Sequence, residues 1–265
     1  MTRRNVPRMS HRRFCSLLLT LTSASSRWFG LNNLKIIAAK TQAVAIGPSS
    51  FEYEFHLNNV KVEKQDSLKI LGVLVLDSKL TFKVHIEEQL KKACAKASAL
   101  RRLRKFVPKY VMVRLYKAYV LPHLEYCSPL LLGIGNAETT KMENTNYYLL
   151  RSILGFPKFV SYNDLLKIVN IKSLEQRRQF QSLVMLYKCL YSHGAPYINK
   201  FFNRRNVKYN LRGLSTRLEL PSFNLEYMHR SFTFLVSKLW NALPPTVRES
   251  KDTVSFKRAL NTHMT

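Results

Sequence analysis

The stretch LKKACAKASALRRLRK, residues 90–105, places apolar side chains at three- and four-residue steps and puts cations at many of the positions between them. This spacing keeps the apolar side chains on one side of an α-helix, which has 3.6 residues per turn. The apolar positions are Leu90, Ala93, Ala97, Leu100 and Leu103. The stretch therefore predicts a long amphipathic helix that begins near residue 82 and carries its lysines and arginines largely off the apolar side.

Helical patterns continue toward the carboxyl end of the chain. Pro108 suits the first turn of the next helix, where a backbone N–H has no helical partner to lose. That helix is expected to end near Pro122. Further helices are expected at about 137–154, 162–169, 173–191, 230–242 and 253–263.

The helix expected at 173–191 carries an apolar stripe that predicts a packed core. Its members are Phe180, Leu183, Leu186, Tyr187 and Leu190. Trp240 is expected at the end of a later helix, packing on a turn.

Residues 42–76, ahead of the long helix, have β patterns instead. FEYEFHL (51–57) alternates apolar and polar side chains, which is the period of a half-buried strand. Asn58-Asn59 then predicts a turn into VKVE (60–63) as a hairpin partner. SLKILGVLVL (67–76) is a longer β-rich run that contains a glycine. Short antiparallel strands followed by many helices predict an α+β fold that is mainly α.

Two further divisions follow from the pattern. A boundary is expected near 130–140, where GIGNAETT (133–140) is the candidate linker and an all-helical region follows. Residues 1–27 are expected to be irregular or disordered. Their basic start and short apolar run also have roughly the order of a signal peptide or a transit peptide. A start codon inside an older reading frame explains the segment as well.

The charge of the chain is far from balanced, with 43 Lys+Arg against 16 Asp+Glu and a formal net charge of +27. Self-repulsion at that charge opposes compaction unless a polyanion neutralises it. Nucleic acid is the commonest such partner, an anionic membrane is the second, and lysines scattered for solubility are the third explanation. No stretch approaches the roughly 20 apolar residues that a membrane span requires.

Residues that would indicate a metal, a cofactor or a small-molecule substrate are missing from the sequence. The four cysteines have no CxxC spacing, so we expect free thiols and neither a zinc site nor a disulfide framework. No phosphate-binding GxxxxGK[ST] loop and no GxGxxG motif occurs. No two histidines lie at a metal-ligand step. The sequence predicts neither a metal nor a cofactor.

Five phrases occur in an order that resembles the region after the catalytic loop in reverse transcriptases of LINE-type (non-LTR) retrotransposons. The phrases lie at 28–47, 67–93, 115–133, 142–157 and 240–260. In the first, the matching residues are Trp28, Asn32, Leu34, Lys35, Lys40 and Thr41. In the second they are Leu71, Gly72, Asp77, Leu80, Phe82, His85 and Ile86, and in the third Tyr116, Leu121, Pro122, Glu125 and Tyr126. Ile37 stands where the family usually has an asparagine.

The resemblance implies a domain order and a location. Residues 28–80 would be a remnant of the polymerase palm with short antiparallel strands, 81–135 basic thumb-like helices, and 136–265 a helical carboxyl-terminal region. A chain that follows this family would be intracellular and nuclear. The resemblance also implies truncation ahead of the catalytic Asp-Asp pair of the RNA-directed DNA polymerase.

Nucleotide addition needs carboxylates that hold two divalent cations about 3.5–4 Å apart. The four aspartates of this chain, Asp66, Asp77, Asp164 and Asp252, are not adjacent to one another, and no acid precedes Glu52. Glu87-Glu88 lies on the predicted long helix, where neighbouring side chains diverge by about 100°. We therefore expect a protein without polymerase activity, in which Glu87 and Glu88 are solvated charges near a helix start.

Two expectations concern binding to nucleic acid. In the family, a lysine after the catalytic strands lies near the leaving pyrophosphate, and Lys40 resembles it, although an exposed turn lysine is the simpler interpretation. The thumb resemblance implies that the basic helix binds the backbone of RNA, DNA or an RNA–DNA duplex without reading sequence. The expected contacts are Lys91, Lys92, Lys96, Arg101, Arg102, Arg104 and Lys105 on one helix face, and Arg204, Arg205 and Lys208 in a second cluster. The alternative is a helical protein-interaction or scaffold protein without nucleic-acid function.

Overall fold

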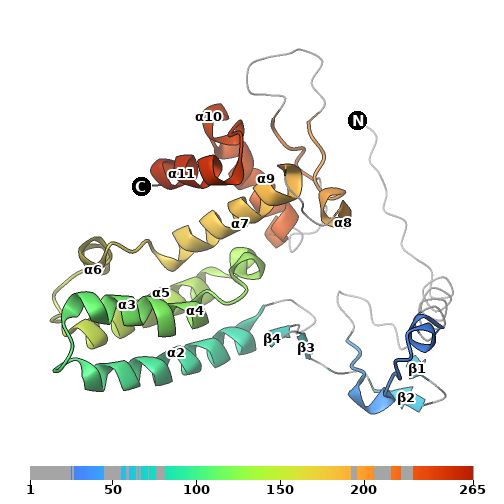
Figure 1. Ribbon diagram of the computed structural model, residues 1–265, viewed down its shortest axis with the longest axis horizontal. Helices are drawn as coiled ribbons and strands as arrows, with labels where there is room; N and C mark the ends of the chain where they lie inside the picture. Colours follow the sequence, from blue (N-terminus) through green and yellow to red (C-terminus); the bar gives the residue numbers. More distant parts are fainter. Residues whose placement is uncertain are drawn as a thin grey trace. The chain divides into compact units, whose positions relative to one another are not determined.

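The computed structural model describes residues 25, 27–44, 55–57, 60–63, 65, 67–70, 72–75, 81–191, 196–205, 216–221 and 229–264. The chain falls into two compact units, Met1–Phe82 and Lys83–Thr265. Figure 1 shows the elements of both, and each unit is described here by itself. Most of residues 1–27, which the sequence predicts to be irregular or disordered, lie outside the described residues.

The first unit holds the strands. β1 (Phe55–Leu57) pairs antiparallel with β2 (Val60–Val62), as the alternation and the Asn58-Asn59 dipeptide predict. β3 (Leu68–Ile70) pairs antiparallel with β4 (Val73–Val75) in a second two-stranded sheet. The β-rich run at 67–76 is therefore a hairpin rather than one long strand. Gly72, with φ of 79°, adopts the left-handed conformation that glycine tolerates best and that reverses the chain here.

The second unit is helical. Helix α2 (Lys83–Leu103) begins within one residue of the expected start. Helix α3 (Lys109–Tyr119) follows, with Pro108 as its N-cap rather than inside its first turn. The remaining helices are α4 (Leu121–Leu124), η2 (Ser128–Gly133), α5 (Asn136–Leu154), α6 (Tyr162–Val169), α7 (Leu174–Tyr191), α8 (Pro196–Asn199), α9 (Phe232–Ala242), α10 (Pro245–Arg248) and α11 (Thr253–His263). An α+β chain that is mainly α is thereby confirmed.

The boundary expected near 130–140 lies inside this second unit. Gly133 ends the 3-10 helix η2, and only two residues separate it from Asn136, which begins α5. Helix α5 packs against α2 and α3, so the segment at 133–140 joins parts of one packed body. The division between the two compact units falls after Phe82.

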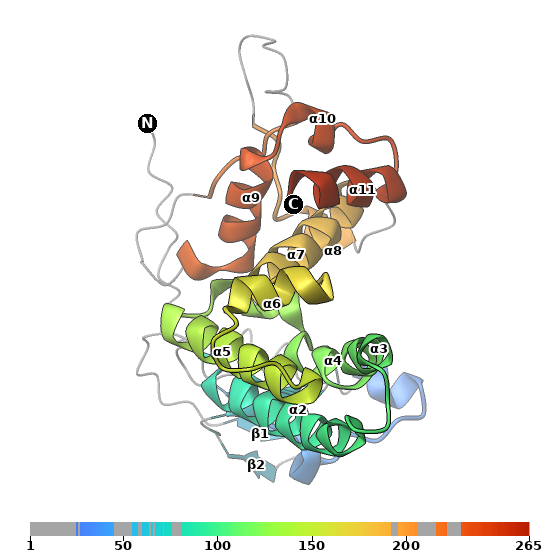
Figure 2. The ribbon, with the colours of Figure 1, turned by 90° about the vertical axis from the view of Figure 1, so that its left-hand side faces the viewer.

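Two groups of helices form the second unit, and Figures 1 and 2 show them from two sides. In the first group α2, α3 and α5 lie together, and the buried side of α2 faces the other two. Its buried residues are His85, Ile86, Gln89, Leu90, Ala93, Ala97 and Leu100. Four of the five expected apolar positions are among them, while Leu103 at the end of the helix is exposed.

The second group packs α7 against α9 and α11. Leu183, Leu186 and Tyr187 are buried, and Phe180 and Leu190 pack against the same core, so the stripe predicted in this helix is confirmed. The Tyr187 ring stacks on Phe256 with centroids 4.3 Å apart. Trp240, fully buried in α9, donates from Nε1 to the Thr216 carbonyl oxygen at 2.9 Å. Aromatic rings therefore supply much of this core.

A chain of hydrogen bonds between buried and half-buried polar side chains connects the two groups. The Tyr116 hydroxyl donates to Asn146 Oδ1, and Asn146 Nδ2 donates to the Tyr162 hydroxyl at 2.8 Å. Tyr162 in turn donates to Glu143, whose other carboxylate oxygen accepts the backbone N–H of Glu175 at 2.8 Å in the first turn of α7. Burial raises the pKa of both tyrosine hydroxyls, so they remain donors at neutral pH.

Among the described residues, no helix combines the length and the apolar composition needed to cross a bilayer.

Candidate nucleic-acid interface

The cations predicted on the long helix are all exposed. They are Lys91, Lys92, Lys96, Arg101 and Arg102 on α2, and Arg104 and Lys105 in the turn that follows it. Lys91 and Arg102 are eleven residues apart, which places them on the same side of the helix and about 16 Å apart along its axis. That side is opposite the buried face, so both side chains point away from the helical body.

The cations on α2 spread over more than one line along the helix. Lys92 and Lys96 lie on one flank of α2, because each is rotated by roughly 100° or more from Lys91. Arg101 lies on the other flank, where it lines a small hollow of about 50 Å³ with Tyr148 and Ser152 of α5. The positive charge therefore covers the exposed half of the helix, since its apolar residues occupy only the half that packs.

The ion pairs of α2 lie at the beginning of this helix. Lys141 donates to Glu87 at 2.9 Å, and Lys83 lies 3.7 Å from Glu138. The Lys141 ammonium lowers the pKa of the Glu87 carboxyl. Beyond Glu88 the sequence has no acid before Glu125. Within the described part of the unit, no cation from Lys91 through Lys117 forms an ion pair.

Arg104 has a second role in addition to its charge. Its Nη1 donates to the Ser152 carbonyl oxygen at 3.2 Å, and its side chain covers Gly155. Gly155, with φ of 72°, is the left-handed residue that ends α5. Arg104 thus satisfies one of the carbonyls that a helix leaves without an internal partner at its carboxyl end.

Exposed aromatic rings lie among these cations. Phe106 is 82% exposed and Tyr110 is 66% exposed, at the turn from α2 to α3. The Arg114 guanidinium lies 5.8 Å from the centroid of the Tyr110 ring, and Lys109 lies 4.9 Å from that of Phe156 at the end of α5. Figures 1 and 2 show the end of α2, the start of α3 and the end of α5 at one end of the helical group.

We call this end of the unit, together with the exposed face of α2 as far back as Lys91, the basic-aromatic surface. It consists of Lys91, Arg101, Arg102, Arg104, Lys105, Phe106, Lys109, Tyr110, Arg114, Tyr148 and Arg151. The aromatic members were not predicted, because no single helix carries them all. The acid-free interval between Glu88 and Glu125 is the sequence signal that marks most of the region.

The second predicted cluster lies elsewhere. Arg204 and Arg205 are exposed, and the Arg204 guanidinium lies 5.5 Å from the centroid of the Tyr191 ring at the end of α7. Arg204 is paired with Leu218 in an isolated antiparallel bridge, in which the backbone N–H of Arg205 donates to the Arg217 carbonyl oxygen and that of Glu219 donates to the Asn203 carbonyl oxygen. Lys208 lies outside the described residues. Both views place α8 and the segment after it away from the end of α2, so the structure does not bring the two clusters together.

Other residues singled out in the sequence have ordinary surroundings. Lys40 ends the short helix η1 (Ala38–Lys40) in the first unit and is exposed. Asp252 is the N-cap of α11. In the first turn of α6 the Asp164 carboxylate accepts a hydrogen bond from the Ser161 hydroxyl. Of the residues that the structure describes, no three His, Cys, Asp or Glu side chains come together as a metal site. Cys94, Cys127 and Cys189 are free thiols, and burial raises the pKa of each.

No protein-family model, curated protein or solved structure matches this chain.

Proposed function

We propose that this chain corresponds to the part of a LINE-type retrotransposon reverse transcriptase that follows the polymerase centre, and that it binds the backbone of RNA or of an RNA–DNA duplex without sequence preference. The five ordered phrases support the family, and the basic-aromatic surface supports the activity. The proposed role is to hold nucleic acid. The adjacent aspartates that nucleotide addition requires do not occur in this sequence.

One observation carries the proposal. The cations from Lys91 through Lys117 are exposed and have no acidic partner in the described part of their unit. Surface lysines and arginines usually have acids interspersed among them, whereas a backbone-binding surface concentrates one sign of charge. Each phosphate that such a cation neutralises releases a condensed counterion, and this release drives binding at low salt.

The exposed rings suggest how a single strand would bind the same surface. Phe106 and Tyr110 can each stack on an unpaired base, and every base has a π-face, so stacking is tolerant of sequence. The Arg114 guanidinium lies 5.8 Å from the centroid of the Tyr110 ring, so it would contact a phosphate next to a base that stacks there. Charge and stacking together therefore predict salt-sensitive binding that does not depend on base order.

The test measures binding of the full chain to a short RNA–DNA duplex by fluorescence anisotropy across about 50–200 mM salt. The variant Lys91→Gln/Arg102→Gln removes two charges from the exposed face of α2, one near the middle of the helix and one at its end. Its affinity should fall, and the slope of log affinity against log salt should become shallower by about two. A second duplex of scrambled sequence should bind the unmodified chain equally well.

The matched control is Lys257→Gln/Arg258→Gln on α11, which removes the same charge from exposed positions in the other helical group. If the two double variants behave alike, net charge alone accounts for binding and the surface on α2 has no special role. A chain that binds none of the polynucleotides but forms a stable oligomer would favour the protein-interaction alternative.

A further inference from the structure

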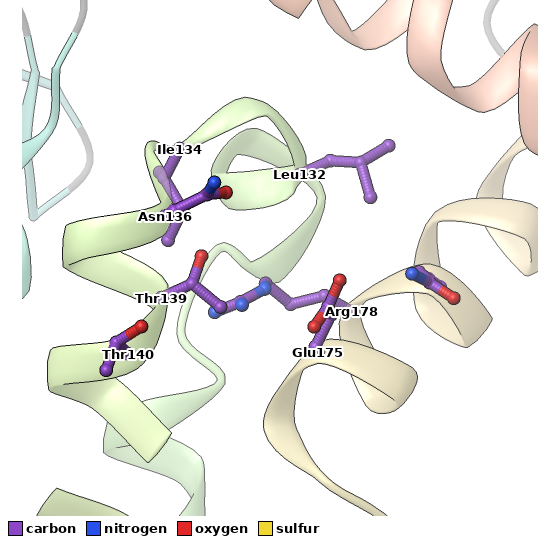
Figure 3. A pocket seen from close by; sticks show the side chains of 8 residues that line it. Leu132, Ile134, Asn136, Thr139, Thr140, Glu175 and Arg178 are labelled. Atoms are coloured by element: carbon purple, nitrogen blue, oxygen red, sulfur yellow. The ribbon is translucent and has the colours of Figure 1, made fainter. Parts of the chain in front are cut away.

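A pocket of about 340 Å³ lies in the second unit, between the start of α5 and the first turns of α7 (Figure 3). It is lined by Leu132, Ile134, Asn136, Thr139, Thr140, Glu175, Arg178 and Gln179. The lining is mostly polar. It comes from the end of η2 and the start of α5, which are close in sequence, and from α7, which follows later in the chain. The pocket contains none of the residues of the basic-aromatic surface.

Arg178 is the unusual member of this lining, because it is only 3% exposed. Its Nη1 donates to the Met142 sulfur at 3.4 Å, which is a weak acceptor. It forms no ion pair with a described residue. Buried guanidinium groups are ordinarily paired with a carboxylate, since removing the charge from water costs several kcal/mol.

The acids near Arg178 are committed elsewhere or lie beyond ion-pairing distance. Glu143 accepts the Tyr162 hydroxyl and two backbone N–H groups of α7. Glu175 is exposed and lines the pocket without pairing with Arg178. Burial lowers the pKa of the Arg178 guanidinium, while these two carboxylates act in the opposite direction. An arginine remains protonated at neutral pH under such conditions.

Neutral donors surround the space in front of the guanidinium. Figure 3 shows Arg178 reaching from α7 toward Thr139 on α5, with Thr140 and Asn136 on the same helix. The N-cap of α5 is Gly135, which has no side chain to satisfy the first backbone N–H groups of the helix. An anion in this position would meet a buried guanidinium, hydroxyl donors and the positive end of a helix dipole.

We infer that this pocket binds a small oxyanion group, a phosphate or a carboxylate, with Arg178 as the main ligand and Thr139 as a second donor. The planar guanidinium matches either group with two parallel hydrogen bonds. The Glu175 carboxylate on the lining opposes a high negative charge, so a singly charged group is favoured. The pocket is separate from the basic-aromatic surface. An experiment can therefore refute anion binding in the pocket without refuting nucleic-acid binding on the surface, and the reverse also holds.

The test uses inorganic phosphate and acetate as probes against chloride at matched ionic strength. The readouts are the thermal midpoint of the full chain and, for phosphate, the ³¹P line width. Either anion should raise the midpoint of the unmodified chain more than chloride does. Arg178→Met should abolish the effect, and Thr139→Val should weaken apparent affinity by roughly fivefold, as expected for one lost hydrogen bond.

Lys91→Gln/Arg102→Gln is the control that keeps the pocket and alters the surface on α2, and it should keep the full anion effect. Stabilisation by phosphate alone or by acetate alone would identify which oxyanion the site prefers. The inference is overturned if neither anion exceeds chloride, or if Arg178→Met responds as the unmodified chain does. Should Arg178→Met fail to fold, Arg178→Lys replaces it, because lysine keeps the charge but loses the paired hydrogen bonds; unchanged affinity in that variant would count against the site.

Discussion

The guanidinium of Arg104 donates to the carbonyl oxygen of Ser152 over 3.2 Å, joining the turn after α2 to the last turn of α5. This bond holds together two elements that carry exposed cations and rings. The same residue is thus part of the proposed binding surface and part of the structure that supports it. Its neighbours Arg102 and Lys105 have no such bond to a described residue.

Replacing Arg104 should therefore affect stability as well as binding. Arg104→Met is expected to lower the free energy of unfolding by about 0.5–1 kcal/mol, because a carbonyl at the end of α5 loses its donor. Arg102→Met should leave stability unchanged within about 0.5 kcal/mol. Both variants should weaken duplex binding to a similar degree. Urea unfolding followed by circular dichroism would measure the first difference, and equal stabilities would argue against the capping role.

The exposed rings of Phe106 and Tyr110 should matter for single strands and much less for duplexes. Phe106→Ala and Tyr110→Ala are each expected to weaken binding of single-stranded RNA by about fivefold or more, the equivalent of about 1 kcal/mol per stacked base. The salt slope should not change, since no charge is removed. Tyr197→Ala on α8 is the matched control, because that ring is 68% exposed but lies away from this surface. An equal loss in the control would show that the effect is not local.

Asp252 should make stability depend on pH in the acid range. Its carboxylate accepts the backbone N–H groups of Val254 and Ser255 at 2.7 and 2.8 Å, and bonding to Ser255 lowers its pKa below the ordinary value of 3.8. A lowered folded-state pKa means that the stabilisation is complete above the unfolded pKa and is lost as pH falls through the folded one.

The difference in thermal unfolding midpoint between the unmodified chain and Asp252→Ala should therefore be constant near neutral pH and should become smaller in strong acid. Asp252→Asn keeps a capping side chain that does not titrate. The difference in thermal unfolding midpoint between Asp252→Asn and Asp252→Ala should not change across the same pH range. Parallel profiles for all three proteins would exclude a contribution from this carboxylate.

Gly133 is expected to tolerate no side chain. A Cβ at this position would lie 2.0 Å from the backbone oxygen of Arg230, which cannot move away as a flexible side chain can. Gly133→Ala should destabilise the helical unit by roughly 1–3 kcal/mol. At Gly135 the nearest atom is the movable end of Glu138, at 2.7 Å, so Gly135→Ala should cost less. Thermal unfolding of the two variants compares them directly, and the reverse order would contradict the close approach.

Local patterns were enough to place the main helices. The helix expected at 162–169 is α6 with the same ends, because Ser161 caps it and Asn170 ends it in the left-handed conformation. Such signals act within one or two turns, so they are legible in the chain itself. The short elements α4, η2, α8 and α10 were not expected. Helices this short have little periodicity, and packing against longer neighbours fixes them instead.

Of the candidate nucleic-acid interface, only the positively charged residues could be predicted from the sequence. The exposure of Lys91 and Arg102 follows from their place opposite an apolar stripe on one helix. The ring of Tyr148 joins them only because α2 and α5 pack side by side. Arg178 had no signal, because a single arginine on a helix face looks like a surface residue until its neighbours are known.

The amino-acid sequence by itself determined the helices, the positive charge and its concentration in an acid-free interval, because each depends on residue types at fixed local spacing. Only the tertiary structure decided which residues from different helices meet. It buries Arg178 beside the first turn of α5, and it joins Arg104 to Ser152. The physical reason is that such contacts depend on how helix faces pack, and packing is set by side-chain shape across the whole unit rather than by spacing along one segment.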